Sequence, residues 1–214
     1  MIRCLLLSAT ICCAAPLFAA DAELVARDLF ITLDSEPTAF TYTANGPTGT
    51  RSGDDAFDSG FGLSVGLRWS FTPSGSPLGL VAGADLGATN YRYQDGAANL
   101  TTGARVVLGA GWAFNDSWEL LIEPTVEYGL ARFNFPATVS YPSLKANGTY
   151  FGFGLRANTV WRISEDWALM GAIGWKRLTD NLSGGGIDLT LVQSGPCISI
   201  GALYRFSSAP TRIE

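Results

Sequence analysis

Residues 61–71 read Phe-Gly-Leu-Ser-Val-Gly-Leu-Arg-Trp-Ser-Phe, and this stretch decides the fold of the chain. Every odd-numbered position in it is apolar, and every even-numbered position is Gly, Ser or Arg. Successive side chains of a β-strand point to opposite faces of the sheet, so a period of two predicts a strand with one apolar face. Arg68 lies on the opposite, polar face of that strand.

The same alternation recurs along the rest of the chain, and no helical period of comparable strength appears. We expect an eighth strand within 24–43, because the last strand ends on the side of the short turns and the first must start there. A short helix before a strand is the alternative for that segment. The other predicted strands lie near 57–71, 78–92, 100–114, 118–133, 149–163, 167–178 and 190–206.

The predicted connections alternate between two lengths. Short ones lie at 72–77, 115–117 and 164–166, and long ones at roughly 34–60, 90–101, 134–148 and 178–194. A meander with short turns at one end and long loops at the other is typical of transmembrane β-barrels. The predicted fold class is therefore all-β: an eight-stranded antiparallel up-and-down transmembrane β-barrel.

Tryptophan gathers near the short turns, always on the apolar face of a predicted strand. In a closed barrel these residues form one ring, which matches the aromatic girdle at a bilayer interface. A soluble lipocalin-like barrel that binds an apolar ligand is the alternative, with the apolar face inside. The expected girdle consists of Trp69, Trp112, Trp118, Trp161 and Trp167, with a second aromatic level at Phe61, Tyr91, Phe133, Phe151 and Trp175.

The polar faces of the strands carry charged residues that point into the predicted lumen. Eight strands leave an interior just wide enough for side chains to fill, so we expect a structural charge network rather than an open pore. Two long side chains have glycine opposite them, Arg156 facing Gly174 and Lys176 facing Gly154. The expected members of the network are Arg68, Asp85, Arg105, Glu119, Glu123, Glu127, Arg156, Arg162, Lys176 and Arg205.

One hairpin allows the register to be predicted residue by residue. Pairing Phe114 with Trp118 across the turn 115–117 sets every later pair of the two strands. Arg105 then lies opposite Glu127, within reach of an ion pair. We therefore expect Glu127→Ala to leave Arg105 without a partner.

The sequence contains no positive sign of catalysis. Residues 62–66 match the G-x-S-x-G pattern of serine hydrolases, but Ser64 lies mid-strand and the chain has no histidine to act as a base. Glu119, Glu123 and Glu127 recur every four residues, so neighbours are about 13 Å apart, too far for paired acid–base carboxylates. We expect neither an enzyme nor a cofactor.

Other binding motifs are weak. Residues 152–157 resemble a dinucleotide fingerprint in glycine spacing, but no helix pattern follows them. Asp54, Asp55 and Asp58 are expected to form a solvated acidic loop rather than a cation site. A net charge of −5 disfavours a nucleic-acid partner, which requires a basic surface.

The first 20 residues have the features of a secretory signal peptide. Arg3 supplies a positive charge, 5–17 are apolar, and small residues follow at a cleavage point after Ala19 or Ala20. A lipoprotein attached through Cys12 or Cys13 is the alternative. Removal of this segment leaves Cys197 as the one cysteine, so no internal disulfide is expected.

The last predicted strand alternates through Ile198, Ile200 and Ala202 to Tyr204 and Phe206. This ending resembles the C-terminal assembly signal of outer-membrane β-barrel proteins. The chain as a whole resembles their small eight-stranded OmpA/OmpX-type class, although members of that class usually stop at the terminal aromatic residue. The expected division is a signal peptide (1–20), a barrel (21–206) and a C-terminal tail (207–214).

The resemblance implies a location in the bacterial outer membrane. The implied partners are outer-membrane lipid, the barrel-assembly machinery and an unknown surface ligand that binds the long loops. The implied role is non-enzymatic, in envelope structure or in surface interaction such as adhesion, with four outer loops above a polar, plugged interior.

Overall fold

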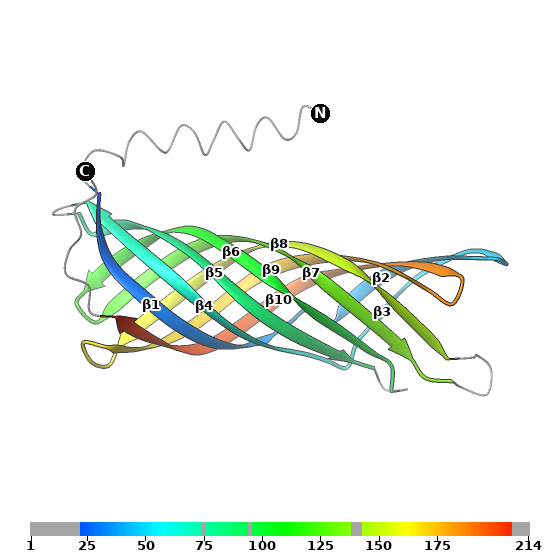
Figure 1. The fold of residues 1–214 in the computed structure, drawn as a ribbon. Coiled ribbons are helices and arrows are strands. Elements are labelled where there is room, and N and C mark those ends of the chain that lie inside the picture. Colours follow the sequence, from blue (N-terminus) through cyan, green and yellow to red (C-terminus); the bar gives the residue numbers. More distant parts are fainter. Residues whose placement is uncertain (1–21, 74–75, 94–95, 138–142, 207–214) are drawn as a thin grey trace, which may run out of the picture.

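The computed structural model describes residues 22–73, 76–93, 96–137 and 143–206. The expected signal peptide (1–20) and tail (207–214) therefore lie outside the described residues. Ten antiparallel strands form one sheet (Figure 1). The strands are β1 (Ala22–Ser35), β2 (Ala39–Gly46), β3 (Gly49–Ala56), β4 (Ser59–Pro73), β5 (Leu78–Arg92), β6 (Ala98–Asn115), β7 (Trp118–Phe135), β8 (Leu144–Arg162), β9 (Trp167–Gly184) and β10 (Ile187–Phe206).

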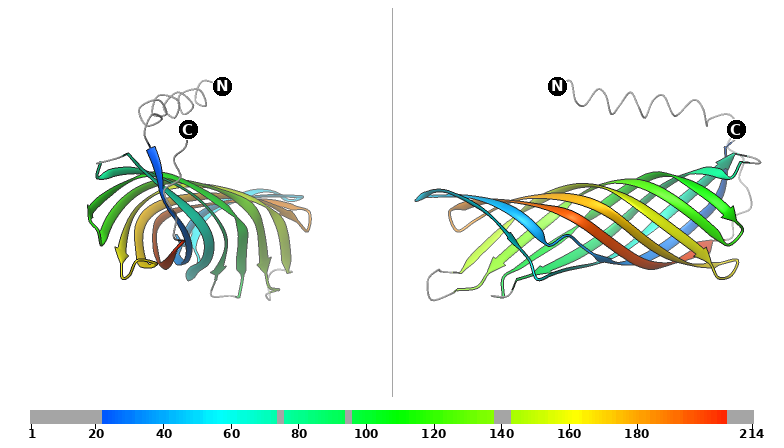
Figure 2. Two further views of the ribbon diagram at one scale, coloured as in Figure 1. Left: turned by 60° about the vertical axis from the view of Figure 1, so that its left-hand side comes forward. Right: turned by 180° about the vertical axis from the view of Figure 1, so that it is seen from behind.

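Eight of these strands close into a ring. Each of β4 to β9 pairs with the next strand in the chain, β1 pairs with β4, and a further pairing between β1 and β10 completes the barrel. The hairpin β2–β3 lies outside the ring and extends the sheet from the far part of β10, as Figures 1 and 2 show. The predicted eight-stranded, antiparallel, up-and-down class is confirmed.

The barrel has an apolar outside and a polar inside. Outward Leu63, Leu108 and Ile200 are 50%, 50% and 62% exposed, whereas inward Ser64 and Arg105 are buried. Outward apolar side chains continue from the girdle tryptophans, at the end with the short turns (the turn end), to Phe61, Tyr128, Phe151 and Trp175 toward the other end (the loop end). We call this zone the apolar belt. It is the exterior that a transmembrane barrel presents to lipid. Tyr91 and Phe133 of the predicted second aromatic level are wrong, because both face the interior of the barrel.

Two apolar layers lie inside the barrel, one on each side of a charged zone. The first, the inner layer, is near the turn end, and the second, the outer cluster, is near the loop end. Among the described residues, no helix is long and apolar enough to cross a membrane. The inner layer contains Phe30, Val81, Leu121, Val160, Met170 and Leu203, and the outer cluster contains Phe57, Tyr91, Ala131, Ala146, Tyr150, Leu178, Leu182, Leu189 and Leu191.

The eighth strand expected within 24–43 is β1, but the long loops differ from the prediction. The segment 24–43 holds most of β1 and the start of β2, not a helix. Much of the predicted loop 34–60 is the hairpin β2–β3, and the predicted loop 178–194 is a hairpin that turns at Gly185 and Gly186, both with positive φ. The loop end is therefore built largely from strands.

These segments were missed because the alternation changes phase beyond the belt. On β9, Trp175 is the last large apolar residue that faces outward, and Leu178 and Leu182 face inward. Thr179 and Asn181 occupy the outward positions of the same segment. Water replaces lipid outside the belt, so the apolar face moves to the inside, as in a soluble barrel.

β10 changes partner at a proline. It pairs with β2 from Asp188 to Gln193 and with β1 from Ile198 to Phe206, and Pro196 lies between these two stretches. Proline has no N–H to donate to a neighbouring strand, so a break in the ladder is tolerated there. This break is where the chain leaves the ring to form the hairpin β2–β3.

The register of β6 and β7 agrees with the prediction except at the turn. Arg105 pairs with Glu127 in the ladder, as predicted. The predicted pair of Phe114 with Trp118 is wrong, because Trp118 pairs with Asn115 through an irregularity in β6. The Asn115 Oδ1 atom accepts hydrogen bonds from the backbone N–H groups of Ser117 and Trp118 at 2.8 and 2.9 Å, which holds this tight turn.

Candidate functional site

The charged zone of the lumen is a set of buried ion pairs, which we call the middle network. Lys176 on β9 is placed between two carboxylates from distant parts of the chain. Its Nζ atom lies 2.8 Å from Glu36 Oε1 and 3.0 Å from Glu127 Oε1. All three side chains are buried. The other members of the middle network are Asp34, Asp85, Arg105, Glu123 and Arg156.

Arg105 binds a different carboxylate from the one predicted. Its Nε atom donates to Asp85 Oδ2 at 2.8 Å, and its Nη2 atom lies 3.8 Å from Asp34 Oδ2. Glu127, directly opposite Arg105 in the ladder, pairs instead with Lys176. The predicted Arg105–Glu127 ion pair is therefore wrong, because long side chains in a narrow lumen reach beyond the residue opposite them.

Arg156 and Glu123 form a further pair on adjacent strands. The Arg156 Nη2 atom lies 3.2 Å from Glu123 Oε2, which also accepts a hydrogen bond from Asn158. Gly174 faces Arg156 across β8 and β9, as predicted. A Cβ atom at Gly174 would lie 2.9 Å from Arg156 Cγ and 2.4 Å from the Leu155 carbonyl oxygen, so glycine provides the room for arginine.

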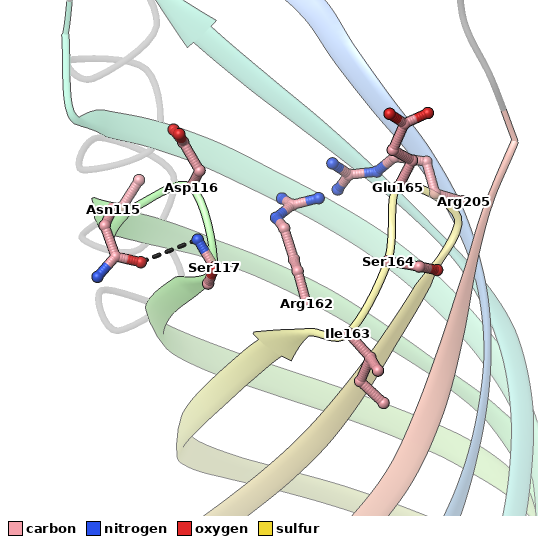
Figure 3. Close-up of a pocket in the computed structure, with 9 residues that line it drawn as sticks. Asn115, Asp116, Ser117, Arg162, Ile163, Ser164, Glu165 and Arg205 are labelled. Atoms are coloured by element: carbon pink, nitrogen blue, oxygen red, sulfur yellow. Dashed lines mark hydrogen bonds between the residues drawn. The ribbon is translucent and has the colours of Figure 1, made fainter.

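The remaining predicted charges lie toward the turn end, where the barrel opens into a cavity of about 730 Å³ (Figure 3). Arg162 and Arg205 line this cavity, with Arg162 directed between the two turns drawn in Figure 3. Arg162 Nη2 lies 3.7 Å from Glu119 Oε2, and Arg205 Nε lies 2.9 Å from Asp28 Oδ1. Phe30 of the inner layer is two residues beyond Asp28 on β1, so apolar packing closes the lumen just past this mouth.

The structure places all ten predicted charges inside the barrel, but the sequence reasoning missed three partners. Asp28, Asp34 and Glu36 come from β1 and the residue after it. Asp28 also pairs with Arg68, whose Nη2 atom is 3.4 Å from Asp28 Oδ2. The sequence did place Asp28 and Asp34 on the same face of a strand, because both positions are even. The apolar Phe30 lies on that face between them, so the alternation of polar and apolar residues was not visible.

The five predicted girdle tryptophans lie near the turn end, on the outward face of their strands. Trp118 and Trp161 stack with their ring centroids 5.7 Å apart. Tyr204 packs edge-on against Trp167 at 5.1 Å and against Phe206 at 5.4 Å. The predicted assembly residues therefore join the aromatic surface at the turn end.

A buried carboxyl lies in the outer cluster, beyond the belt. Asp180 is fully buried, and its Oδ2 atom accepts a hydrogen bond of 2.6 Å from the Asn99 amide. Burial raises the pKa of Asp180 to about 6, and the hydrogen bond from Asn99 opposes that rise.

The chemistry available in the lumen is limited. Ser64 donates a hydrogen bond to Asp34 at 3.1 Å and lies mid-strand, without the strained turn of a hydrolase nucleophile. The described residues contain no group of three or more His, Cys, Asp and Glu side chains that could hold a metal ion. Asp54 and Asp55, weighed above as a cation site, are successive residues of strand β3. The cavities within the middle network measure only about 20 and 10 Å³.

No protein-family model and no curated protein matches the chain. Solved structures of similar fold include Ail, the attachment invasion locus protein of Yersinia pestis, in complex with the heparin analogue sucrose octasulfate (13% identity, 87% of this chain and 99% of that chain, TM-score 0.41). They also include the outer membrane protein OprG from Pseudomonas aeruginosa (11%, 86% and 98%, TM-score 0.46). A third is the outer membrane protease OmpT from Escherichia coli (10%, 88% and 99%, TM-score 0.45).

These comparisons describe fold alone. A closed ring of eight antiparallel strands, apolar outside and charged and packed inside, defines the class of small transmembrane β-barrels. The chain has the fold of that class.

Proposed function

We propose that this chain is an integral protein of the bacterial outer membrane that uses a closed barrel to hold a sheet above the membrane surface for interaction with partners. The observation that carries the proposal is the continuation of β8, β9 and β10 past the apolar belt, joined there by the hairpin β2–β3. In outer-membrane barrels the short turns face the periplasm, so this sheet faces the cell exterior.

The proposed role is non-enzymatic. The fold does not decide this, since OmpT is a protease. Support comes from the lumen, where Glu119, Glu123 and Glu127 each lie within ion-pair distance of a basic side chain, and from the absence of histidine in the chain. The interior is plugged by the middle network and by the two apolar layers that flank it.

The soluble lipocalin-like alternative does not fit this arrangement. Such a barrel binds its ligand in an apolar interior cavity, whereas this barrel holds buried ion pairs and has its apolar face outside. Tyr204 and Phe206 remain the proposed contact for the barrel-assembly machinery, and the ligand of the outer sheet remains to be identified.

An epitope tag placed in each kind of turn tests the location and orientation. One tag is inserted between Pro47 and Thr48, at the tip of the hairpin β2–β3, and the matched tag between Asp116 and Ser117. We expect antibody to label the first tag on intact cells and the second only after permeabilisation. Recovery of the chain in the soluble fraction without detergent, or labelling of both tags on intact cells, would contradict the proposal.

A further inference from the structure

Beyond the apolar belt, the outer wall of the barrel carries outward basic residues on four strands, β5, β7, β8 and β9. The outward charged residues on this part of β5 to β9 are all basic: Arg92, Arg132, Lys145 and Arg177. Among the described residues of these strands, no carboxylate faces outward there. Exposed carboxylates lie elsewhere on the wall, with Asp54 on β3 and Asp188 on β10. Near Arg92 the charge is mixed, because exposed Asp58 donates its backbone N–H to the Arg92 carbonyl oxygen at 2.8 Å.

Two of these cations form a compact group with two amides. Arg132 is directly opposite Asn147, and Asn134 is directly opposite Lys145, on β7 and β8. Opposite residues of an antiparallel pair have Cβ atoms about 5 Å apart, and alternate residues of one strand share a face. All four side chains are exposed, and none has a hydrogen bond or ion pair to another described residue.

This group lies immediately beyond the belt on the same two strands. Leu130 precedes Arg132 on the outward face, and one step closer to the belt Tyr128 is opposite Phe151. These three side chains are large, apolar and about half exposed or more. Each step of two residues along a tilted strand rises about 5 Å, so the group lies at the height of lipid headgroups.

We propose that Arg132 and Lys145, with Asn134 and Asn147, bind the phosphate of a lipid in the surrounding outer leaflet, whose acyl chains lie along the apolar residues below them. Guanidinium binds phosphate through two parallel N–H groups, ammonium adds a point charge, and the amides supply further donors. The apolar surface and the basic group are continuous, which matches a ligand that has both parts. This inference rests on the proposed membrane location.

The test uses the purified barrel reconstituted into phosphatidylcholine vesicles that contain a minor fraction of phosphatidic acid. After extraction into mild detergent, the ratio of phosphatidic acid to phosphatidylcholine retained by the protein is measured. We expect the wild-type chain to enrich phosphatidic acid, and Arg132→Gln/Lys145→Gln to lower the enrichment about tenfold. The control, Arg51→Glu, changes the net charge by the same amount at an exposed position on the hairpin β2–β3 and is expected to retain the lipid.

Equal retention by the double variant and by the control would overturn the proposal. Displacement of the lipid by millimolar inorganic phosphate would also overturn it, because the site would then take free phosphate instead of a lipid. Failure of the wild-type chain to enter phosphatidylcholine vesicles would contradict the proposed function. Insertion of the chain into vesicles without enrichment of phosphatidic acid would contradict the lipid site but not the proposed function.

Discussion

Arg105 lies 2.8 Å from Asp85 through its Nε atom, although Glu127 is its partner in the ladder. We expect double-mutant cycles to give couplings of roughly 1–3 kcal/mol for Arg105 with Asp85 and for Lys176 with Glu127, since both pairs are in buried contact. The cycle for Arg105 with Glu127 should give a coupling near zero. Urea unfolding from lipid vesicles measures all three, and strong coupling in the third cycle would contradict the pairing described here.

Asp180 gives the barrel a pH dependence of known sign. Its pKa rises to about 6 on folding, from about 4 in an unfolded chain, so the protonated form is favoured in the barrel. Its contribution to stability is therefore full below about pH 4 and is lost as the pH rises through 6. We expect the unfolding free energy of Asp180→Asn, minus that of the wild type, to increase by roughly 2–3 kcal/mol from pH 4 to pH 8.

The measurement is the unfolding free energy of both proteins across that range, so that titration of every other group cancels in the difference. Asn99→Ala is the matched comparison. It removes the hydrogen bond that stabilises the charged carboxylate and should steepen the pH dependence. A difference between wild type and Asp180→Asn that does not change with pH would show that Asp180 stays ionised.

At the scale of strands, the apolar belt divides each strand into a lipid-facing and a water-facing part. Leu108 faces outward within the belt, and Asn147 faces outward beyond it. We expect Leu108→Arg to cost roughly 2–4 kcal/mol and Asn147→Arg about 0–1 kcal/mol, because the cost of a charge on the lipid face depends on its depth. Equal costs in vesicle refolding would mean that the belt is misplaced.

The strands were predictable inside the belt and much less so outside it. From Trp167 to Trp175 the outward positions of β9 include large apolar residues, and a period of two identifies the strand. From Leu178 to Leu182 the apolar residues lie on the opposite parity, so the two halves together show no single alternation. A prediction from the apolar pattern ends β9 where the apolar residues switch faces, although the strand continues to Gly184.

For the whole molecule, the packing of the interior is the property with the clearest consequence. The inner layer, the middle network and the outer cluster follow one another through the barrel, and the cavities found within the network hold no more than a water molecule or two. We therefore expect the purified protein to show no large steady conductance in planar bilayers. A stable channel of porin size would contradict the packed interior.

The sequence by itself determined the ring of eight strands, the faces of these strands within the apolar belt and the end that carries the tryptophans. These features could be predicted because every outward position within the belt faces lipid, which favours an apolar residue there whatever its neighbours are. The tertiary structure alone decided which charges pair and where the hairpin β2–β3 lies. Closure of the ring brings Asp34 of β1 near Arg105 of β6, and a partner across the lumen leaves no periodic trace along the chain.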